Sequence, residues 1–178
     1  MIRTDRLTLR GWRDEDVAPF LAMGRDPRVM AYFPALLSPS EAAETAVRQR
    51  ATLAGFGYCF WVIERNSDRA FLGFCGVKPG AEGTPINGEP EIGWRLAHSH
   101  WAQGYAREAA EASLAWMWAN TDAPRVSAIT VPANARSRAL MTRIGMTHLA
   151  DADFDHRALP PGHRLRRHVL YVIDRPAC

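Results

Sequence analysis

The sequence predicts a mixed α/β fold. Three observations support this: short runs of alternating or β-branched and aromatic residues, longer stretches with helical periodicity, and the order in which they follow one another. That order is strand, two helices, three strands, helix, strand, helix and two strands. The chain has 178 residues, of which 47% are hydrophobic, so it is long enough to bury a core as one unit. We therefore expect a single domain over residues 1–178.

The first half of the chain contains clear start signals. The alternation over Leu7–Arg10 predicts a strand, and the acidic residues 14–16 indicate the start of a helix. Ser38-Pro39-Ser40-Glu41 combines a serine cap, a proline at the first helical position and a glutamate at the third. The helix that follows is expected to run to about Leu53, before two glycines.

The remaining elements follow from the same signals. Asn66-Ser67-Asp68 is typical of a turn, so the strands on either side of it are expected to form a hairpin. The segment 91–131 is expected to be a right-handed strand–helix–strand crossover. The expected strands are 58–64, 71–77, 91–96, 125–131, 146–150 and 165–174, the helices are 104–119 and 134–144, and the loops are 78–90 and 151–163.

Composition excludes several classes of protein. No apolar run approaches the roughly 20 residues that span a bilayer, and Met1–Arg6 lacks the apolar stretch of a signal peptide. We therefore expect a cytoplasmic protein that does not bind membranes. The net charge is +3 and no block of Lys or Arg occurs, which makes nucleic acid an unlikely partner. The three cysteines form no CxxC pair, and the Asp and His residues of 151–168 match no ligand spacing, so no metal is expected.

The segment from Glu91 to Arg107 has the pattern of an anion site. A strand ends at Leu96, a short loop follows, and a helix begins at Gly104. Gly104 and the small Ala106 allow backbone N–H groups to approach an anion, which the helix N-terminus favours. The segment contains neither Gly-x-Gly-x-x-Gly nor Gly-Lys-Ser/Thr, so a Rossmann site or a P-loop is poorly supported. An ordinary tight loop remains the alternative.

Three motifs in order resemble the GNAT superfamily of N-acyltransferases. They are Glu91-Ile-Gly-Trp, then Trp101-x-x-Gly-Tyr-Ala-x-Glu-Ala, then Asn134-x-x-Ser-x-x-Leu followed by Ile144-Gly-Met. With the opening Thr4–Arg10 and the closing His168–Tyr171, they look like the RimJ/RimL-like branch, which acetylates ribosomal-protein N-termini and other amines. The resemblance implies the GNAT fold: a central, mostly antiparallel sheet of six to seven strands, flanked by about four helices.

The resemblance also implies acetyl-CoA as co-substrate. Its pyrophosphate is expected on the backbone N–H groups of residues 101–106, and its pantetheine arm in a gap beside the strand that Pro132 ends. Trp101 departs from the Arg or Gln that the superfamily prefers there. The residues expected to bind the cofactor are Trp101, Ala102, Gln103, Gly104, Tyr105, Ala106, Arg107, Asn134 and Arg138.

Two residues are candidates for catalysis. Glu91 is expected to take a proton from the attacking amine, directly or through water; the alternative is a carboxylate paired with an arginine such as Arg95. By resemblance Ser137 is expected near the departing thiolate, where a hydroxyl donates a hydrogen bond; the alternative is a solvent-facing serine. Direct attack on the thioester needs no covalent enzyme intermediate.

The sequence thus predicts an acetyl-CoA-dependent N-acetyltransferase that acts on a primary amine. The acceptor is a protein N-terminal α-amine or a small-molecule amine, bound near Tyr32-Phe33-Pro34 and the loops 78–90 and 151–163. Two alternatives stay open: a catalytically idle acyl-CoA-binding module, and a nucleic-acid-binding domain suggested by the pI of about 9.0. A homodimer is also open.

Overall fold

The computed structural model describes residues 1–177 as a mixed α/β fold built on a nine-stranded sheet. The strand order is β1-β2-β3-β4-β5-β6-β9-β7, and β8 pairs with β9. All neighbouring strands are antiparallel except β5 and β6. The bounds are β1 Ile2–Arg3, β2 Leu7–Arg10, β3 Phe60–Arg65, β4 Phe71–Pro79, β5 Pro90–Leu96, β6 Arg125–Thr130, β7 Thr147–His148, β8 Phe154–Asp155 and β9 Arg167–Asp174.

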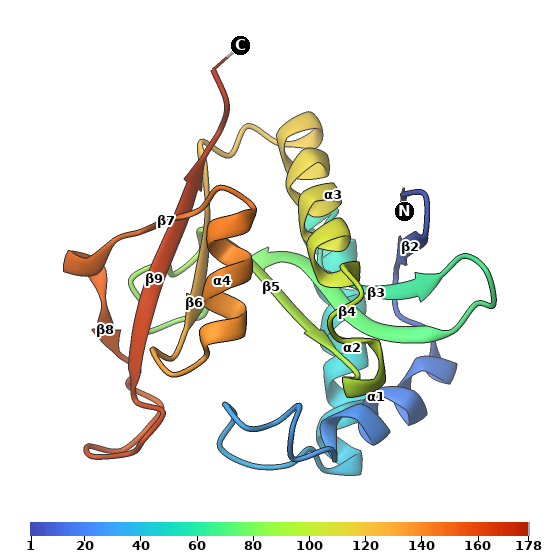
Figure 1. The fold of residues 1–178 in the computed structure, drawn as a ribbon, viewed down its shortest axis with the longest axis horizontal. Helices are drawn as coiled ribbons and strands as arrows, with labels where there is room; N and C mark the ends of the chain where they lie inside the picture. The colour runs from blue at the N-terminus through green and yellow to red at the C-terminus, as the bar shows by residue number, and fades with distance from the viewer. Residues whose placement is uncertain (178) are drawn as a thin grey trace.

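Helices cover both faces of the sheet (Figure 1). The helices α3 (Tyr105–Asn120) and α4 (Ala135–Arg143) contribute to one apolar core, with Ile92, Leu96 and Tyr171 of the sheet. The helices α1 (Val17–Gly24) and α2 (Pro39–Phe56) contribute to a second core with Phe74. The predicted fold class, with four α-helices in residues 1–177, is therefore confirmed.

Several predicted boundaries were wrong. Helix α2 continues to Phe56 and ends at Gly57, whose φ of 77° is left-handed, because Gly55 is tolerated inside the helix. The expected strand 146–150 is reduced to β7 and is followed by the 3₁₀ turn Ala150–Ala152. Strands β1 and β8 were missed, because two residues carry no periodicity. The closing strand begins at Arg167 rather than Leu165.

The strands β5 and β6 are held together at one end and part at the other (Figure 1). Their register contains a single pair, Glu91 with Ser127, whereas β4–β5 pairs over seven positions and β6–β9 over six. Both strands are therefore fixed by their outer neighbours and not by each other. Pro132 lies beyond the end of β6, at the open end of this gap.

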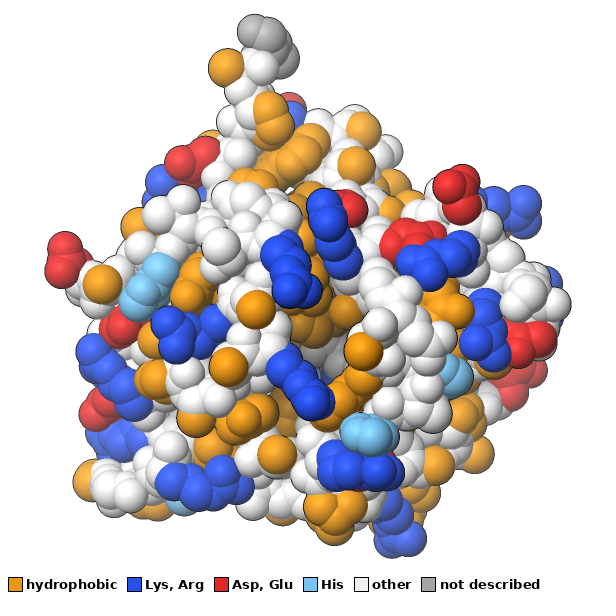
Figure 2. Space-filling model, in the orientation of Figure 1, with side chains coloured by type: hydrophobic (Ala, Val, Ile, Leu, Met, Phe, Trp, Pro, Cys, Tyr) orange, Lys and Arg blue, Asp and Glu red, His pale blue; other side chains and the backbone are white. Residues whose placement is uncertain are grey.

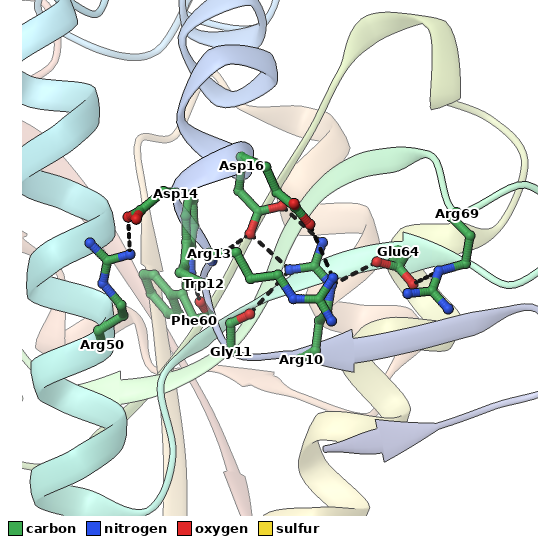
Figure 3. Close-up of polar contacts among 11 residues, drawn as sticks. Arg10, Gly11, Trp12, Arg13, Asp14, Asp16, Arg50, Phe60, Glu64 and Arg69 are labelled. Atoms are coloured by element: carbon green, nitrogen blue, oxygen red, sulfur yellow. Dashed lines mark hydrogen bonds and ion pairs between the residues drawn. The ribbon is translucent and has the colours of Figure 1, made fainter.

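A buried ion network joins β2, β3 and the start of α1 (Figure 3). The guanidinium of Arg10 donates to both oxygens of Asp16 at 2.8 Å, and through Nε to Glu64 at 2.7 Å. Arg69 approaches the other oxygen of Glu64 at 2.5 Å. The hydrogen bond to Asp16 raises the pKa of Arg10, against the opposing effect of burial. This network therefore sets the position of α1 and of the segment that follows it.

Removing the cation from this network is expected to be costly. In Arg10→Met, Asp16 loses its guanidinium partner while buried, so the free energy of unfolding should fall by about 3–5 kcal/mol. Urea denaturation at pH 7 measures this. The matched control is Arg50→Met, because Arg50 pairs with the 93% exposed Asp14 and surface pairs contribute little. Equal small losses in both variants would contradict the role of Arg10.

Candidate active site

The two strands that border the gap each carry a buried polar atom without a hydrogen bond. In residues 1–177, the only buried side-chain nitrogen or oxygen atoms without a hydrogen bond are Arg95 Nε and Ser127 Oγ. Arg95 belongs to β5 and Ser127 to β6, so these atoms lie on the two strands that border the gap. Buried polar groups are normally paired, and exceptions call for an explanation. A ligand that enters the gap would supply one.

The loop at residues 101–104 leads from the open end of β5 to the N-terminus of α3. Ala102 and Gly104 have φ of 59° and 81°, both left-handed. The amide N–H groups of residues 102–107 donate to no acceptor within residues 1–177. The first turn of a helix leaves its N–H groups free and carries positive potential. This loop therefore has the properties of an anion site.

The N-terminal strand segment braces this loop. Arg6 donates to the carbonyl oxygen of Gln103 at 3.0 Å and pairs with Glu108 at 2.6 Å, while Thr4 donates to Glu108 at 2.6 Å. Burial alone would raise the pKa of Glu108, but the hydrogen bonds from Thr4 and Arg6 lower it overall. Arg6 thus holds the loop through the carbonyl oxygen of Gln103 and leaves the amide N–H groups of residues 102–104 free. The sequence analysis missed Arg6 and Glu108 as site residues.

The other residues expected to bind the cofactor differ in where their side chains point. Trp101 donates its indole N–H to the carbonyl of Leu96 at 2.8 Å, and its ring is covered by Arg136 at 4.6 Å. Tyr105 is buried, and Arg107 pairs with Glu111 on the surface. The side chains of Trp101 and Tyr105 thus support the loop, and the amides of residues 102–107 keep no acceptor within residues 1–177.

The N-terminus of α4 borders the same gap. Asn134 caps the helix by accepting from the amide of Ser137 at 3.3 Å, and donates to Thr130 at 3.1 Å. Ser137 is half-buried, and its hydroxyl has no partner within residues 1–177. Arg138 turns back toward the sheet, donating to the hydroxyl of Tyr171 at 3.3 Å and to the Pro132 carbonyl at 3.1 Å. The side-chain amide of Asn134, the free hydroxyl of Ser137 and the guanidinium of Arg138 therefore lie on one short segment beside the gap.

Basic side chains gather around a hollow on this face. Figure 2 shows the hollow between α4 and the N-terminal end of α3, with Lys or Arg on both sides of it. The exposed or half-buried cations of these elements are Arg107, Arg136, Arg138 and Arg143. Such an arrangement favours a ligand that carries several negative charges.

Glu91 lies at the closed end of the gap. The residue is 9% exposed, and its carboxylate accepts from Lys78 Nζ at 2.5 Å across the β4–β5 pair. The ion pair considered with Arg95 is therefore absent; Lys78, the chain's only lysine, takes that place. The sequence analysis missed this pair because it placed residue 78 in a loop, whereas β4 continues to Pro79 and its register with β5 sets Lys78 opposite Glu91.

His168 was not expected as a site residue. It is half-buried on β9, stacked on Phe154 at 5.5 Å, with Nδ1 3.1 Å from the Arg166 carbonyl. Burial lowers the pKa of His168, and the charge of Glu91 opposes this in part. The contact assigns the ring hydrogen to Nδ1 and leaves Nε2 as a neutral acceptor at pH 7.

Loops from distant parts of the chain meet at the other face. A pocket of about 610 Å³ lies between residues 83–87 and the segment 154–166. The α1–α2 segment (residues 25–38) reaches the second half of the molecule: Tyr32 donates to the Ala133 carbonyl and Arg164 to the Ala31 carbonyl, each at 3.0 Å. The loops expected to surround an acceptor are therefore neighbours.

Within residues 1–177, no group of three or more His, Cys, Asp or Glu side chains is placed to hold a metal ion. No helix in this part of the chain is long and apolar enough to cross a membrane.

Comparison with known proteins identifies the class. The family model described as "Acetyltransferase (GNAT) domain" matches residues 6–147. The Bacillus subtilis protein YkkB, itself uncharacterized, is 33% identical over 146 residues, which cover 80% of this chain and 83% of YkkB. The chain therefore belongs to the GNAT acetyltransferase family and is an N-acetyltransferase.

Solved structures agree in fold. A GNAT-family acetyltransferase from Bacillus anthracis superposes with a TM-score of 0.80 at 20% identity, covering 98% of each chain. RimL, a ribosomal L7/L12 α-N-protein acetyltransferase in complex with coenzyme A, has a TM-score of 0.75 at 17% identity over 96% and 95% of the chains. Spermidine N-acetyltransferase from Vibrio cholerae, in complex with CoA and spermine, has a TM-score of 0.74 at 16% identity, covering 97% of each chain.

Replacing Gly104 tests the anion loop. In Gly104→Val, a left-handed β-branched residue is strained by about 1–2 kcal/mol, and its Cβ would lie 3.3 Å from Arg6 Nη2. We expect acetyl-CoA affinity, measured by calorimetry, to fall at least about tenfold. This corresponds to the loss of one charge-assisted hydrogen bond.

The matched control is Gly57→Val. Gly57 is also left-handed and has no neighbour within 4 Å of an added Cβ, but it ends α2. The Gly57→Val variant should be less stable than the wild type and keep the wild-type affinity for acetyl-CoA. Unchanged affinity in Gly104→Val would remove the loop from the cofactor site.

Proposed function

We propose that this protein transfers the acetyl group of acetyl-CoA directly to a primary amine. The observation that carries the proposal is the row of free amide N–H groups at residues 102–107, placed at the open end of the β5–β6 gap. Free amides at a helix N-terminus bind phosphate, and a gap between parted strands admits an extended arm. Acyl transfer needs a donor and an acceptor to meet, and β5, which borders the gap, carries side chains into the apolar core beneath α3 on one face and Glu91 and Arg95 on the other.

The residues present fit coenzyme A. Amides of Ala102, Gln103, Gly104, Tyr105, Ala106 and Arg107 would hold the pyrophosphate, with Arg136 and Arg138 nearby as cations. Asn134 and the open edges of β5 and β6 would border the pantetheine arm. When bound, acetyl-CoA supplies an acyl carbon activated as a thioester. Ser137, with its free hydroxyl at the start of α4, is proposed to donate a hydrogen bond to the sulfur as the thiolate departs.

Glu91 is the proposed base. An α-amino group has a pKa near 8, so at pH 7 most of an acceptor is protonated and must lose a proton before it attacks. Glu91 is buried at the closed end of the gap, where the thioester would lie, and its carboxylate pairs with Lys78. A carboxylate so placed can take the proton directly or through water.

The acceptor class is the finer part of the proposal. The RimJ/RimL-like motifs of the sequence favour a protein N-terminal α-amine, and the likeness to the RimL fold is compatible with this. The likeness to a spermidine acetyltransferase keeps small-molecule amines open. A single domain over residues 1–178, a cytoplasmic location and a homodimer stay predictions.

A thermal-shift titration with acetyl-CoA, with NAD as control ligand, tests the cofactor. At 100 times the dissociation constant, binding adds about 2.7 kcal/mol to stability, so the melting temperature should rise with acetyl-CoA alone. CoA release with N-terminal peptides and small amines then tests turnover. Binding without turnover on any amine would favour an idle acyl-CoA-binding module, and no shift at millimolar acetyl-CoA would refute the proposal.

Glu91→Gln tests the base. The loss in kcat/KM should be largest near pH 7 and shrink toward pH 9, where the amine is already neutral. The control is Glu89→Gln, an exposed carboxylate in the adjoining loop, which should keep the wild-type profile.

The ion pair requires a second variant, because Glu91→Gln leaves Lys78 unpaired. If Glu91 serves only to neutralise Lys78, the double variant Lys78→Met/Glu91→Gln should recover the rate. If Glu91 is the base, the double variant stays slow. A loss in Glu91→Gln that is uniform across pH, together with recovery in the double variant, would contradict the base role of Glu91.

A further inference from the structure

We propose that Arg95 receives a negatively charged group of the acceptor, so that the substrate is an amine that also carries a carboxylate or similar anion. This inference rests on the proposed function and narrows its acceptor. It starts from the guanidinium of Arg95, which forms no hydrogen bond or ion pair with any residue from 1 to 177. Nothing in the mechanism above uses this residue.

Arg95 is held in place by aromatic rings. Its guanidinium lies 3.7 Å from the centre of the Phe33 ring and 5.4 Å from that of Phe74, and its Nε is buried without a partner. Burial lowers the pKa of Arg95 to about 10, because no carboxylate compensates for the lost water. Arg95 as a whole is half-buried and its Nε is fully buried, and a desolvated cation without a partner is costly. An anion seated on it would remove that cost.

The position of Arg95 places the anion on the acceptor side. Successive residues of a strand point to opposite faces, and Ile92 and Leu96 belong to the core beneath α3. Glu91 and Arg95 therefore share the opposite face, with Gly93 between them against the Phe60 ring. That face is covered by the α1–α2 segment, which contributes Phe33. The amides proposed for the cofactor pyrophosphate lie at the N-terminus of α3, on the other face.

The surroundings have the charge that an anion requires. Arg164, which binds the Ala31 carbonyl of the α1–α2 segment, forms no ion pair with residues 1–177, and neither does Arg157 of the same loop. Arg166 and Arg167 share the single carboxylate of Asp155. Glu91 is neutralised by Lys78. A polyamine would meet net positive charge here, whereas an acidic acceptor is attracted.

The spacing along β5 sets the size of the acceptor. Arg95 lies four positions after Glu91 along the strand, which corresponds to about 13 Å between their Cα atoms. An extended peptide covers about 3.3–3.6 Å per residue. A free N-terminus at Glu91 would therefore bring an acidic group at position two, three or four of the peptide within reach of the Arg95 side chain.

The test compares tetrapeptide amides that differ only by Glu or Gln at position two, three or four. The wild type should prefer Glu in at least one position by about tenfold or more in kcat/KM, as a charge-assisted hydrogen bond provides. Arg95→Met, which keeps apolar contact with Phe33, should reduce this preference to within about twofold. Arg28→Met is the control, because Arg28 lies on the same segment paired with Asp26; it should keep the preference.

The other possible outcomes would each contradict the proposal, and each has a distinct meaning. Equal turnover of Glu and Gln peptides by the wild type contradicts it while leaving acetyl transfer intact. A preference that persists in Arg95→Met assigns the anion to another residue. If Arg95→Met weakens acetyl-CoA and leaves the preference unchanged, the anion belongs to the cofactor. Peptide thermal shifts, with and without CoA, test Arg95 independently of turnover: no Glu-over-Gln difference there refutes the inference, even if acetyl-CoA fails to bind.

Discussion

The structure depends on one constraint: β5 and β6 are paired only at Glu91 and Ser127 and then part. Each strand is fixed by a long antiparallel pairing on its outer side, so the two strands keep their positions without further pairing to each other. A sheet normally satisfies its backbone groups strand by strand. Beyond that one pair, the backbone groups on the facing edges of β5 and β6 do not bond to each other. An extended ligand arm can bond to these groups instead.

The elements around the gap are stabilised elsewhere. The Arg10 network fixes α1 to the sheet, and Arg6, Thr4 and Glu108 fix the 101–104 loop to the N-terminal strands. These contacts lie outside the gap, so binding need not break them. The unsatisfied groups, by contrast, belong to the elements that border the gap: the free amides at the start of α3, Ser127 Oγ on β6 and the guanidinium of Arg95 on β5. The polar groups left unpaired therefore mark the site.

The fold was predictable where local signals are strong. The capping box at Ser38 and Glu41 forms as expected, with Ser38 accepting from the Glu41 amide, and Gly104 lies at the helix start in a left-handed conformation. Lys78 and Arg6 act across strand and helix boundaries, so their partners follow only from register and packing. The left-handed conformation of Ala102 has no signal in its residue type. Arg95 was considered as a partner for Glu91, and its isolation between two rings required the three-dimensional structure.

Hydrogen–deuterium exchange with and without acetyl-CoA tests the central claim most directly, because it reports on individual backbone amides. The account predicts that bound acetyl-CoA slows exchange of the amides at residues 102–107 and along residues 93–96 of β5, with little change in α1 and α2. Protection confined to other segments, or acetyl-CoA binding with no protection at residues 102–107, would contradict it.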